Sequence, residues 1–256
     1  MRAARWGGGV GGDGKVIAQP CLRRTVWAGV RAICFDLGGT LVRLDSEPTT
    51  GQVAQVLGIS LEESRAVMEQ RAKRRRITAE DLARDLAAAF GRTALVGPLT
   101  QVLERARQRA AEPELFPDAA PVLTALRQRG FALFALTNSL GSSTPAELPT
   151  AFRTLLDRVT YSAETGAVKP EREAFAAVER ASGLRPGQLL HVGDSLRADV
   201  VGATAAGWHT AWLDRHLIGG PLFSPARTVR LTTLTTLPLL LPAGPAPAPT
   251  ATSETR

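Results

Sequence analysis

The sequence predicts an α/β fold, a doubly wound parallel sheet with an inserted helical cap. Beyond residue 116, short apolar runs alternate with helix-length segments, as in parallel strands joined by helical crossovers. A further apolar run lies near residue 32, and a purely helical stretch separates it from the others. We therefore expect one sheet formed by the early and late strands, with the intervening helices lying over it.

The first strand is expected at residues 32–35, where Ala-Ile-Cys-Phe precedes Asp36 and a Gly38-Gly39 turn. The core domain is predicted to comprise residues 31–44 and 114–240. Residues 1–30 include a glycine-rich stretch with no packing pattern. We expect this extension to be disordered, or to be upstream sequence translated from a wrongly chosen start.

Residues 45–113 are predicted to form the helical cap. Segments beginning at Ser60 and Thr78 resemble capping boxes, in which the first side chain and the fourth residue satisfy each other's backbone amides. Gly58 and Gly91 stand where helices would end.

The remaining core is predicted to alternate between helices and strands. Residues 241–256, with their Pro-Ala repeats, are expected to form a flexible tail. The expected helices are 119–129, 151–157 and 171–182, and the expected strands are 131–136, 159–162, 189–192 and 210–213.

Composition limits the class of protein. The formal net charge is +7, but most of the excess lies in residues 1–31, so it does not indicate a nucleic-acid-binding core. Cys21 and Cys34 are too few for a disulfide framework. No apolar run approaches the roughly 18 residues of a membrane-spanning helix. We expect a soluble cytoplasmic protein with no membrane or nucleic-acid partner.

Polar residues follow the predicted strands. Ligands of open parallel sheets bind beyond the carboxyl ends of the strands, where the strand order switches. Two carboxylates, a hydroxyl, an ammonium and the amides of helix N-termini are expected to meet there, a combination suited to a phosphate and a divalent cation. The residues concerned are Asp36, Thr137, Asn138, Ser139, Lys169, Asp194 and Ser195.

Four segments follow one another in the order FDLGGTL (35–41), LTN (136–138), Lys169-Pro170 and GDSLRAD (193–199). In this order they resemble the motifs of haloacid dehalogenase-like (HAD) hydrolases, in the subfamily with a helical cap between the first two motifs. The resemblance spans about residues 31–240 and implies a Rossmann-like core.

The resemblance implies a phosphatase that forms an aspartyl-phosphate on Asp36. Lys169 would neutralise charge on the nucleophile and the phosphate, while Thr137 and the Asn138 amide would hold the phosphoryl oxygens.

The resemblance also implies a Mg²⁺ site. Asp194, the Asp36 carboxylate and the Gly38 carbonyl would bind the cation. Asp199 would lie behind them and orient water or Lys169.

Gly38 departs from the family pattern, because phosphatases of this family usually have an aspartate there as general acid and base. Three interpretations remain open. A phosphatase could recruit another acid, such as Asp45, Ser139 or a cap residue. A carbon–halogen hydrolase needs no such acid, but Asp194 and the metal would then be superfluous. A degenerate or regulatory homologue would show little catalytic turnover.

Other classes compete with this interpretation. DLGGT (36–40) also occurs in sugar kinases, but Gly219-Gly220 is a poor second nucleotide-binding turn. Residues 52–60 have the pattern of a helix-turn-helix, yet acidic residues on the following helix oppose DNA contact. The basic run 73–76 is either a solvated helix face or a clamp for an anionic substrate.

The histidines His191, His209 and His216 are expected to have core or surface roles. We expect a small phosphorylated substrate, and the choice among phosphosugar, nucleotide and other metabolite stays open, as does the oligomeric state.

Overall fold

Six parallel strands form the central sheet of the computed structural model, in the order β3-β2-β1-β4-β5-β6. The structure describes residues 27–217, 228–242 and 244, so the predicted extension up to residue 26 and the tail from residue 245 lie outside it. The strands are β1 (Ala32–Phe35), β2 (Ala132–Thr137), β3 (Arg158–Tyr161), β4 (Leu189–Gly193), β5 (His209–Leu213) and β6 (Thr228–Leu231).

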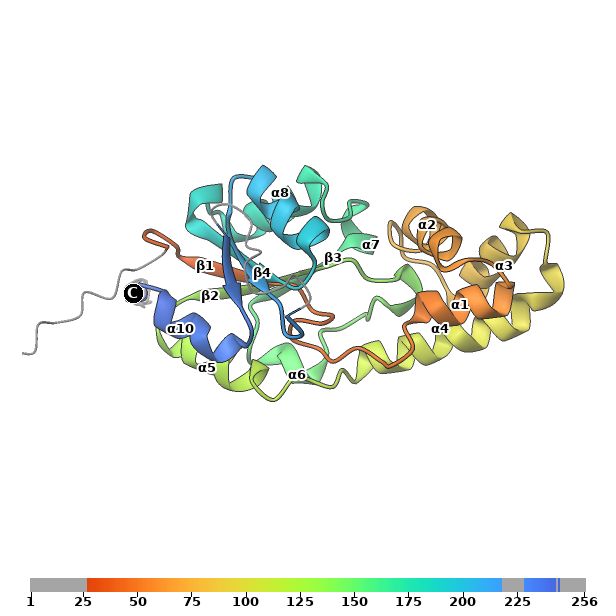
Figure 1. The fold of residues 1–256 in the computed structure, drawn as a ribbon, viewed down its shortest axis with the longest axis horizontal. Helices are drawn as coiled ribbons and strands as arrows, with labels where there is room; N and C mark the ends of the chain where they lie inside the picture. Colours follow the sequence, from red (N-terminus) through yellow and green to blue (C-terminus); the bar gives the residue numbers. More distant parts are fainter. Residues whose placement is uncertain (1–26, 218–227, 243, 245–256) are drawn as a thin grey trace, which may run out of the picture.

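Helices cover both faces of the sheet (Figure 1). Side chains alternate between the faces of a strand, so Ile33 and Phe35 join one apolar cluster while Ala32 and Cys34 join another. The first cluster lies under α5 (Ala119–Gln128) and α10 (Leu237–Leu240), and the second lies under α8 (Arg172–Ser182) and α9 (Gly202–Ala205). Short helices α6 (Thr150–Arg153) and α7 (Ser162–Thr165) flank β3. The predicted doubly wound α/β sheet is confirmed.

Four helices between β1 and β2 form a separate unit at one end of the molecule (Figure 1), which we call the insert. Its apolar side chains form their own cluster, centred on Leu57, Leu82, Leu86, Leu99 and Leu103. The helices are α1 (Thr49–Leu57), α2 (Leu61–Arg71), α3 (Ala79–Ala89) and α4 (Val96–Ala111).

Capping residues explain where several of these helices begin and end. Ser60 forms a complete capping box with Glu63 at the start of α2. Thr78 accepts a hydrogen bond from the Asp81 amide at the start of α3. Gly58 has φ +58 and ends α1 in the left-handed conformation.

The structure shifts two predicted boundaries of the core domain. Trp27 and Val30, which the prediction places in the extension, are buried in the cluster beneath β1. Leu241, predicted as the first residue of the tail, is buried in the same cluster. Large apolar side chains at these positions extend the packed core by a few residues at each end.

Three elements differ from their predictions. The helix predicted at 151–157 ends at Arg153, because Asp157 pairs with β2, exchanging two hydrogen bonds of 2.7 Å with the backbone of Leu133. Strand β6 was not predicted, and residues 196–201 form a π-helical segment that was not predicted either. Among the described residues, no helix combines the length and apolar character that crossing a bilayer requires.

Candidate active site

The order of the strands brings Asp36 and Asp194 together. The chain winds outward from β1 through β2 and β3, then returns to the other side of β1 as β4. Asp36 follows β1, and its amide donates to the Val192 carbonyl of β4 at 2.9 Å. Asp194 directly follows β4. Both carboxylates therefore lie at the switch in strand order, where ligands of open sheets bind.

Lys169 connects two buried carboxylates. Its Nζ lies 2.6 Å from Asp36 Oδ1 and 2.6 Å from Asp199 Oδ1. The side chains of Lys169 and Asp199 are 2% and 1% exposed, whereas that of Asp36 is 12% exposed. Asp36 is thus the member of the network that reaches toward solvent.

Asp199 has partners on both oxygens. In addition to Lys169, His191 Nε2 lies 2.9 Å from Oδ1, and the Ser195 amide donates to Oδ2 at 2.9 Å. His191 is buried, as predicted, and it contacts the site through Asp199. Asp199 therefore holds Lys169 in place.

Burial and neighbouring opposite charges shift the pKa values of Asp36, Lys169 and Asp199 in opposite directions. Burial raises the pKa of Asp36, and the Lys169 charge opposes that rise. Burial also acts against the charged forms of Asp199 and Lys169, but their mutual attraction prevails, lowering the pKa of Asp199 and raising the pKa of Lys169. The Lys169–Asp199 pair is therefore ionised.

The carboxylates fit a divalent cation. One oxygen from each of Asp36, Asp194 and Asp199 lies within 4.8 Å of the other two. Lys169 balances one of these three carboxylates, which leaves negative charge uncompensated. Asp199 is already engaged, so Asp36, Asp194 and the Gly38 carbonyl are the groups that could hold Mg²⁺, an ion that prefers oxygen ligands.

Asp194 shows the effect of this crowding. Loss of hydration, followed by the negative charges of Asp36 and Asp199, raises its pKa to about 7. The residue as a whole is exposed, but its carboxylate packs against the main chain of Gly39, where an added Cβ would overlap Oδ2. Gly193 likewise leaves room for the Asp199 side chain, which a Cβ added at this position would overlap. These two glycines make room for the carboxylates.

Thr137 and Asn138 lie at the end of β2, beside this cluster. The Asn138 side chain donates to the Lys169 carbonyl at 2.9 Å and accepts from the Lys169 amide at 2.8 Å. These bonds commit the side chain to positioning Lys169. The main-chain amide of Asn138 and the Thr137 hydroxyl are the groups left to bind a phosphoryl oxygen.

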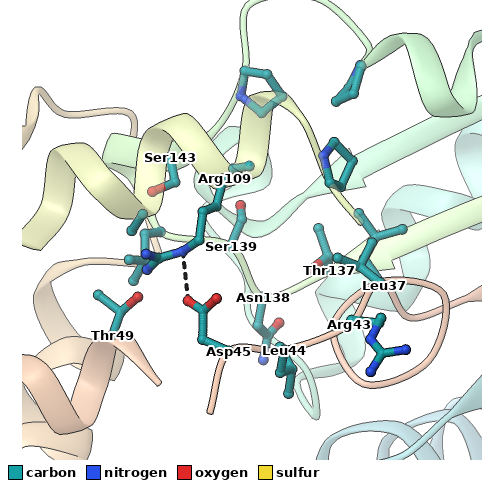
Figure 2. A pocket seen from close by; sticks show the side chains of 18 of the residues that line it. Leu37, Arg43, Leu44, Asp45, Thr49, Arg109, Thr137, Asn138, Ser139 and Ser143 are labelled. Carbon is teal, nitrogen blue, oxygen red and sulfur yellow. Dashed lines mark ion pairs between the residues drawn. The ribbon is translucent and has the colours of Figure 1, made fainter. Parts of the chain in front are cut away.

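A cavity of about 770 Å³ lies between the sheet and the insert (Figure 2). Gly38, Thr137 and Asn138 are among the core residues that line it. The insert contributes Lys73 and Arg109. A small organic substrate would fit between these groups.

Two acids suggested by the sequence line this cavity. Asp45 Oδ2 accepts from Arg109 Nε at 2.6 Å, the ion pair drawn in Figure 2. Ser139 Oγ lies 3.2 Å from Thr144 Oγ1. Both side chains have partners within the protein, and both stay candidates for the acid missing at Gly38.

The basic run joins the insert to the core. Arg74 forms two hydrogen bonds with Glu171, at 3.0 and 2.5 Å, and Arg76 pairs with Glu164 at 2.5 Å. Arg75 pairs with Asp85 inside the insert. Core carboxylates occupy Arg74 and Arg76, which opposes a role for these two arginines as a substrate clamp, while all three arginine side chains remain 39% to 62% exposed.

Arg109 was not identified from the sequence, and Lys73 was identified only as part of the basic run. Arg109 is one of several arginines on α4, and tertiary packing turns it toward the cavity. The contact of His191 with Asp199 was also missed. A polar residue inside an otherwise apolar strand was its one available signal.

Comparisons with known proteins agree with this geometry. A family model for haloacid dehalogenase-like hydrolases matches residues 30–207. The phosphoserine phosphatase of Thermus thermophilus is 36% identical over 112 residues, which cover 43% of this chain and 45% of that protein. The chain thus spans less than half the length of that relative. Phosphatase MT3486 of Mycobacterium tuberculosis is 29% identical over 203 residues, which cover 73% of this chain and 88% of that protein.

Solved structures share the fold. A 2-haloacid dehalogenase from Pseudomonas syringae aligns with a TM-score of 0.59 and 20% identity, covering 82% of this chain and 97% of that one. A HAD phosphatase from Thermococcus onnurineus aligns with a TM-score of 0.55 and 24% identity, covering 84% of this chain and 99% of that one. The family match covers more than half of the chain, and the strand-end residues occur in the order of the family motifs. The chain belongs to the haloacid dehalogenase-like hydrolases.

Proposed function

We propose that this hydrolase is a Mg²⁺-dependent phosphatase of a small phosphorylated metabolite, with Asp36 as the nucleophile. The observation that carries the proposal is the excess of carboxylates over cations around Asp36. A divalent cation bound there would balance this charge and attract a phosphate ester. The phosphatase names of the two relatives described above support the same reaction class.

Each residue has a distinct part in the proposed reaction. An Asp36 carboxylate oxygen attacks phosphorus, the bond from phosphorus to the ester oxygen breaks, and an aspartyl-phosphate forms. Water then hydrolyses this intermediate and releases inorganic phosphate. Lys169 holds Asp36 through its 2.6 Å bond and offsets charge on the phosphoryl group. Thr137 and the Asn138 amide bind the phosphoryl oxygens.

Mg²⁺ bound to Asp36, Asp194 and the Gly38 carbonyl would supply charge stabilisation and orient the phosphoryl group. Asp199 keeps Lys169 charged and in position. The insert acts as a cap that separates the reacting groups from bulk water, with Arg74 and Arg76 holding it against the core.

Gly38 limits the range of good substrates. The leaving alcohol must take its proton from water, from the substrate or from another residue of the site, since the family's usual aspartate is missing. We expect esters with acidic leaving groups to react much faster than alkyl phosphates, because general acid help is worth about 10²- to 10⁴-fold.

Hydrolysis of an aryl phosphate, measured with Mg²⁺ and with chelator, tests the proposal. Wild-type protein should turn over only with metal, and Asp36→Asn should be inactive. Asp85→Asn serves as the matched control, since Asp85 pairs with Arg75 in the insert, away from the site. Turnover that survives chelation or Asp36→Asn would refute the proposal.

Carbon–halogen hydrolysis is the second candidate, favoured by Gly38, because halide leaves without a proton. The same Asp36 carboxylate would then attack carbon. Halide release from a 2-haloacid, with no aryl phosphate turnover, would select this reaction. Absence of both activities in folded protein would select a regulatory homologue.

A further inference from the structure

One cation that lines the cavity between the sheet and the insert has no partner among the residues that the structure describes. Arg74, Arg75 and Arg76 each pair with a carboxylate. Lys73 precedes them and lines the cavity, yet no hydrogen bond or ion pair engages its ammonium among the described residues.

The other charged groups of the cavity lining are mostly paired with each other. Arg109 holds Asp45 at 2.6 Å, and Arg43 lies 3.4 Å from Glu114. Glu112 is exposed at the end of α4, where the chain returns to the core. Arg109 Nη2 has no hydrogen-bond partner, but its guanidinium charge is paired with Asp45. Among the described residues, Lys73 is therefore the cation of this lining that has no carboxylate partner.

Lys73 is half-buried and lies within electrostatic reach of the nucleophile. Burial lowers the pKa of its ammonium, and the negative charges of Glu69 and Asp36 oppose this effect. A partly desolvated cation without a partner loses hydration without compensation, so a substrate anion that pairs with it gains more than it would in water. Lys73 thus lines the same cavity as Gly38, Thr137 and Asn138 of the candidate site, and the Asp36 charge reaches its ammonium.

We propose that the Lys73 ammonium binds a second anionic group of the substrate, a carboxylate or another phosphate, while Asp36 attacks the phosphate ester. This inference rests on the phosphatase function proposed above and narrows its substrate class. The preferred substrates are small phosphate esters that carry a further anionic group, and similar esters without that group bind less well. Lys73 sets this specificity through charge.

Matched pairs of substrates test the inference. In 3-phosphoglycerate a carboxylate replaces the hydroxymethyl group of glycerol 3-phosphate, and fructose 1,6-bisphosphate adds a second phosphate to fructose 6-phosphate. We expect kcat/KM for the member with the second anionic group, in at least one pair, to exceed that for the member without it by about tenfold or more, as for a hydrogen bond between charged groups. The pair that shows the larger ratio identifies the anion.

Variants assign this preference to Lys73. Lys73→Gln should bring the ratio of kcat/KM values within each pair near one, mainly through KM, and Lys73→Arg should retain most of the preference. Arg65→Gln is the matched control, because it removes one positive charge from an exposed position on α2, and its ratio should equal that of wild type. Thermal unfolding of each variant verifies that it is folded.

The outcomes separate the inference from the proposed function. A wild-type ratio near one, with aryl phosphate hydrolysed normally, would overturn the role of Lys73 alone. A ratio that Lys73→Gln leaves unchanged would do the same, since Lys73 would then contact the reacting phosphate or nothing. Absence of turnover with every ester, the aryl phosphate included, would remove the phosphatase function and this inference together.

Discussion

The ammonium of Lys169 lies 2.6 Å from the Asp36 carboxylate and the same distance from Asp199, with almost no exposure to solvent. The nucleophile is thus held by a cation that is itself fixed by a second carboxylate. Such an arrangement positions an attacking oxygen before any substrate binds, and it makes activity and stability depend on the same contact.

Replacing Lys169 with methionine should impair both properties. The change leaves Asp36 and Asp199 buried beside each other without their cation, which we expect to lower the free energy of unfolding by about 3–5 kcal/mol. Loss of the preorganised charge should lower kcat by about 10²- to 10³-fold. Urea unfolding and steady-state hydrolysis measure the two effects. A variant as stable and active as wild type would show that the network is dispensable.

Gly38→Asp should increase phosphatase activity. A Cβ added at Gly38 would meet only the end of the Leu44 side chain, at 3.1 Å, and Gly38 is not among the glycines with positive φ. The new carboxyl could protonate the leaving group, so kcat for an alkyl phosphate should rise by about 10²-fold or more. An aryl phosphate, whose leaving group needs little protonation, should gain less.

Gly38→Asn provides the control for that gain. It has nearly the same size but no transferable carboxyl proton, so it should not reproduce the increase. Equal effects of asparagine and aspartate, or no effect of either, would mean that the protein obtains its acid elsewhere.

Gly39→Ala should weaken Mg²⁺ binding without altering a proposed ligand. Its Cβ would overlap the Asp194 carboxylate, which must then move. Gly29→Ala is the matched control, because Gly29 also has positive φ, +88, but nothing lies within 4 Å of an added Cβ. We expect Mg²⁺ to raise the Tm of wild type and Gly29→Ala, and to raise that of Gly39→Ala much less. Equal shifts in all three would argue against a metal site beside Gly39.

Asp118 should stabilise the core in a pH-dependent manner. Burial disfavours its charge, but hydrogen bonds from Arg215, the Leu234 amide and Thr233 outweigh this cost and lower the pKa of Asp118. The folded state therefore favours the carboxylate, and the stabilisation is present above the unfolded pKa of about 3.9 and lost as pH falls below it.

Asp118→Asn should lower the free energy of unfolding by about 2–4 kcal/mol at pH 7. Unfolding by urea at pH 7 and near pH 3.5 checks the prediction, since the difference from wild type should shrink at the lower pH. A constant difference would mean that packing, and not the charge of Asp118, accounts for the loss.

The strands that carry the site could be predicted from sequence because each is short, apolar and followed by a polar residue. Strand β1 occupies the residues predicted for it, and Asp36 and Asp194 follow their strands as expected. Strand β6 escaped prediction because Arg230 interrupts its few apolar residues at the sheet edge, where burial is partial.

The cavity could not be predicted in the same way, because its lining depends on how the insert packs against the core. The sequence groups Lys73 with Arg74, Arg75 and Arg76 as one basic run. In the structure the arginines pair with carboxylates while Lys73 faces the cavity. Neighbouring residues of like charge thus have different roles, because each one contacts a different part of the folded protein.

Direct detection of phosphoryl transfer to Asp36 tests the central claim most closely. Wild-type protein would be mixed with Mg²⁺ and a slowly hydrolysed ester, quenched in acid and mapped by peptide mass spectrometry. We predict a hydroxylamine-sensitive phosphoryl group on the peptide that contains Asp36, absent from Asp36→Asn. Phosphate release by wild type with no phosphoryl group on Asp36 at any time during turnover would contradict the account.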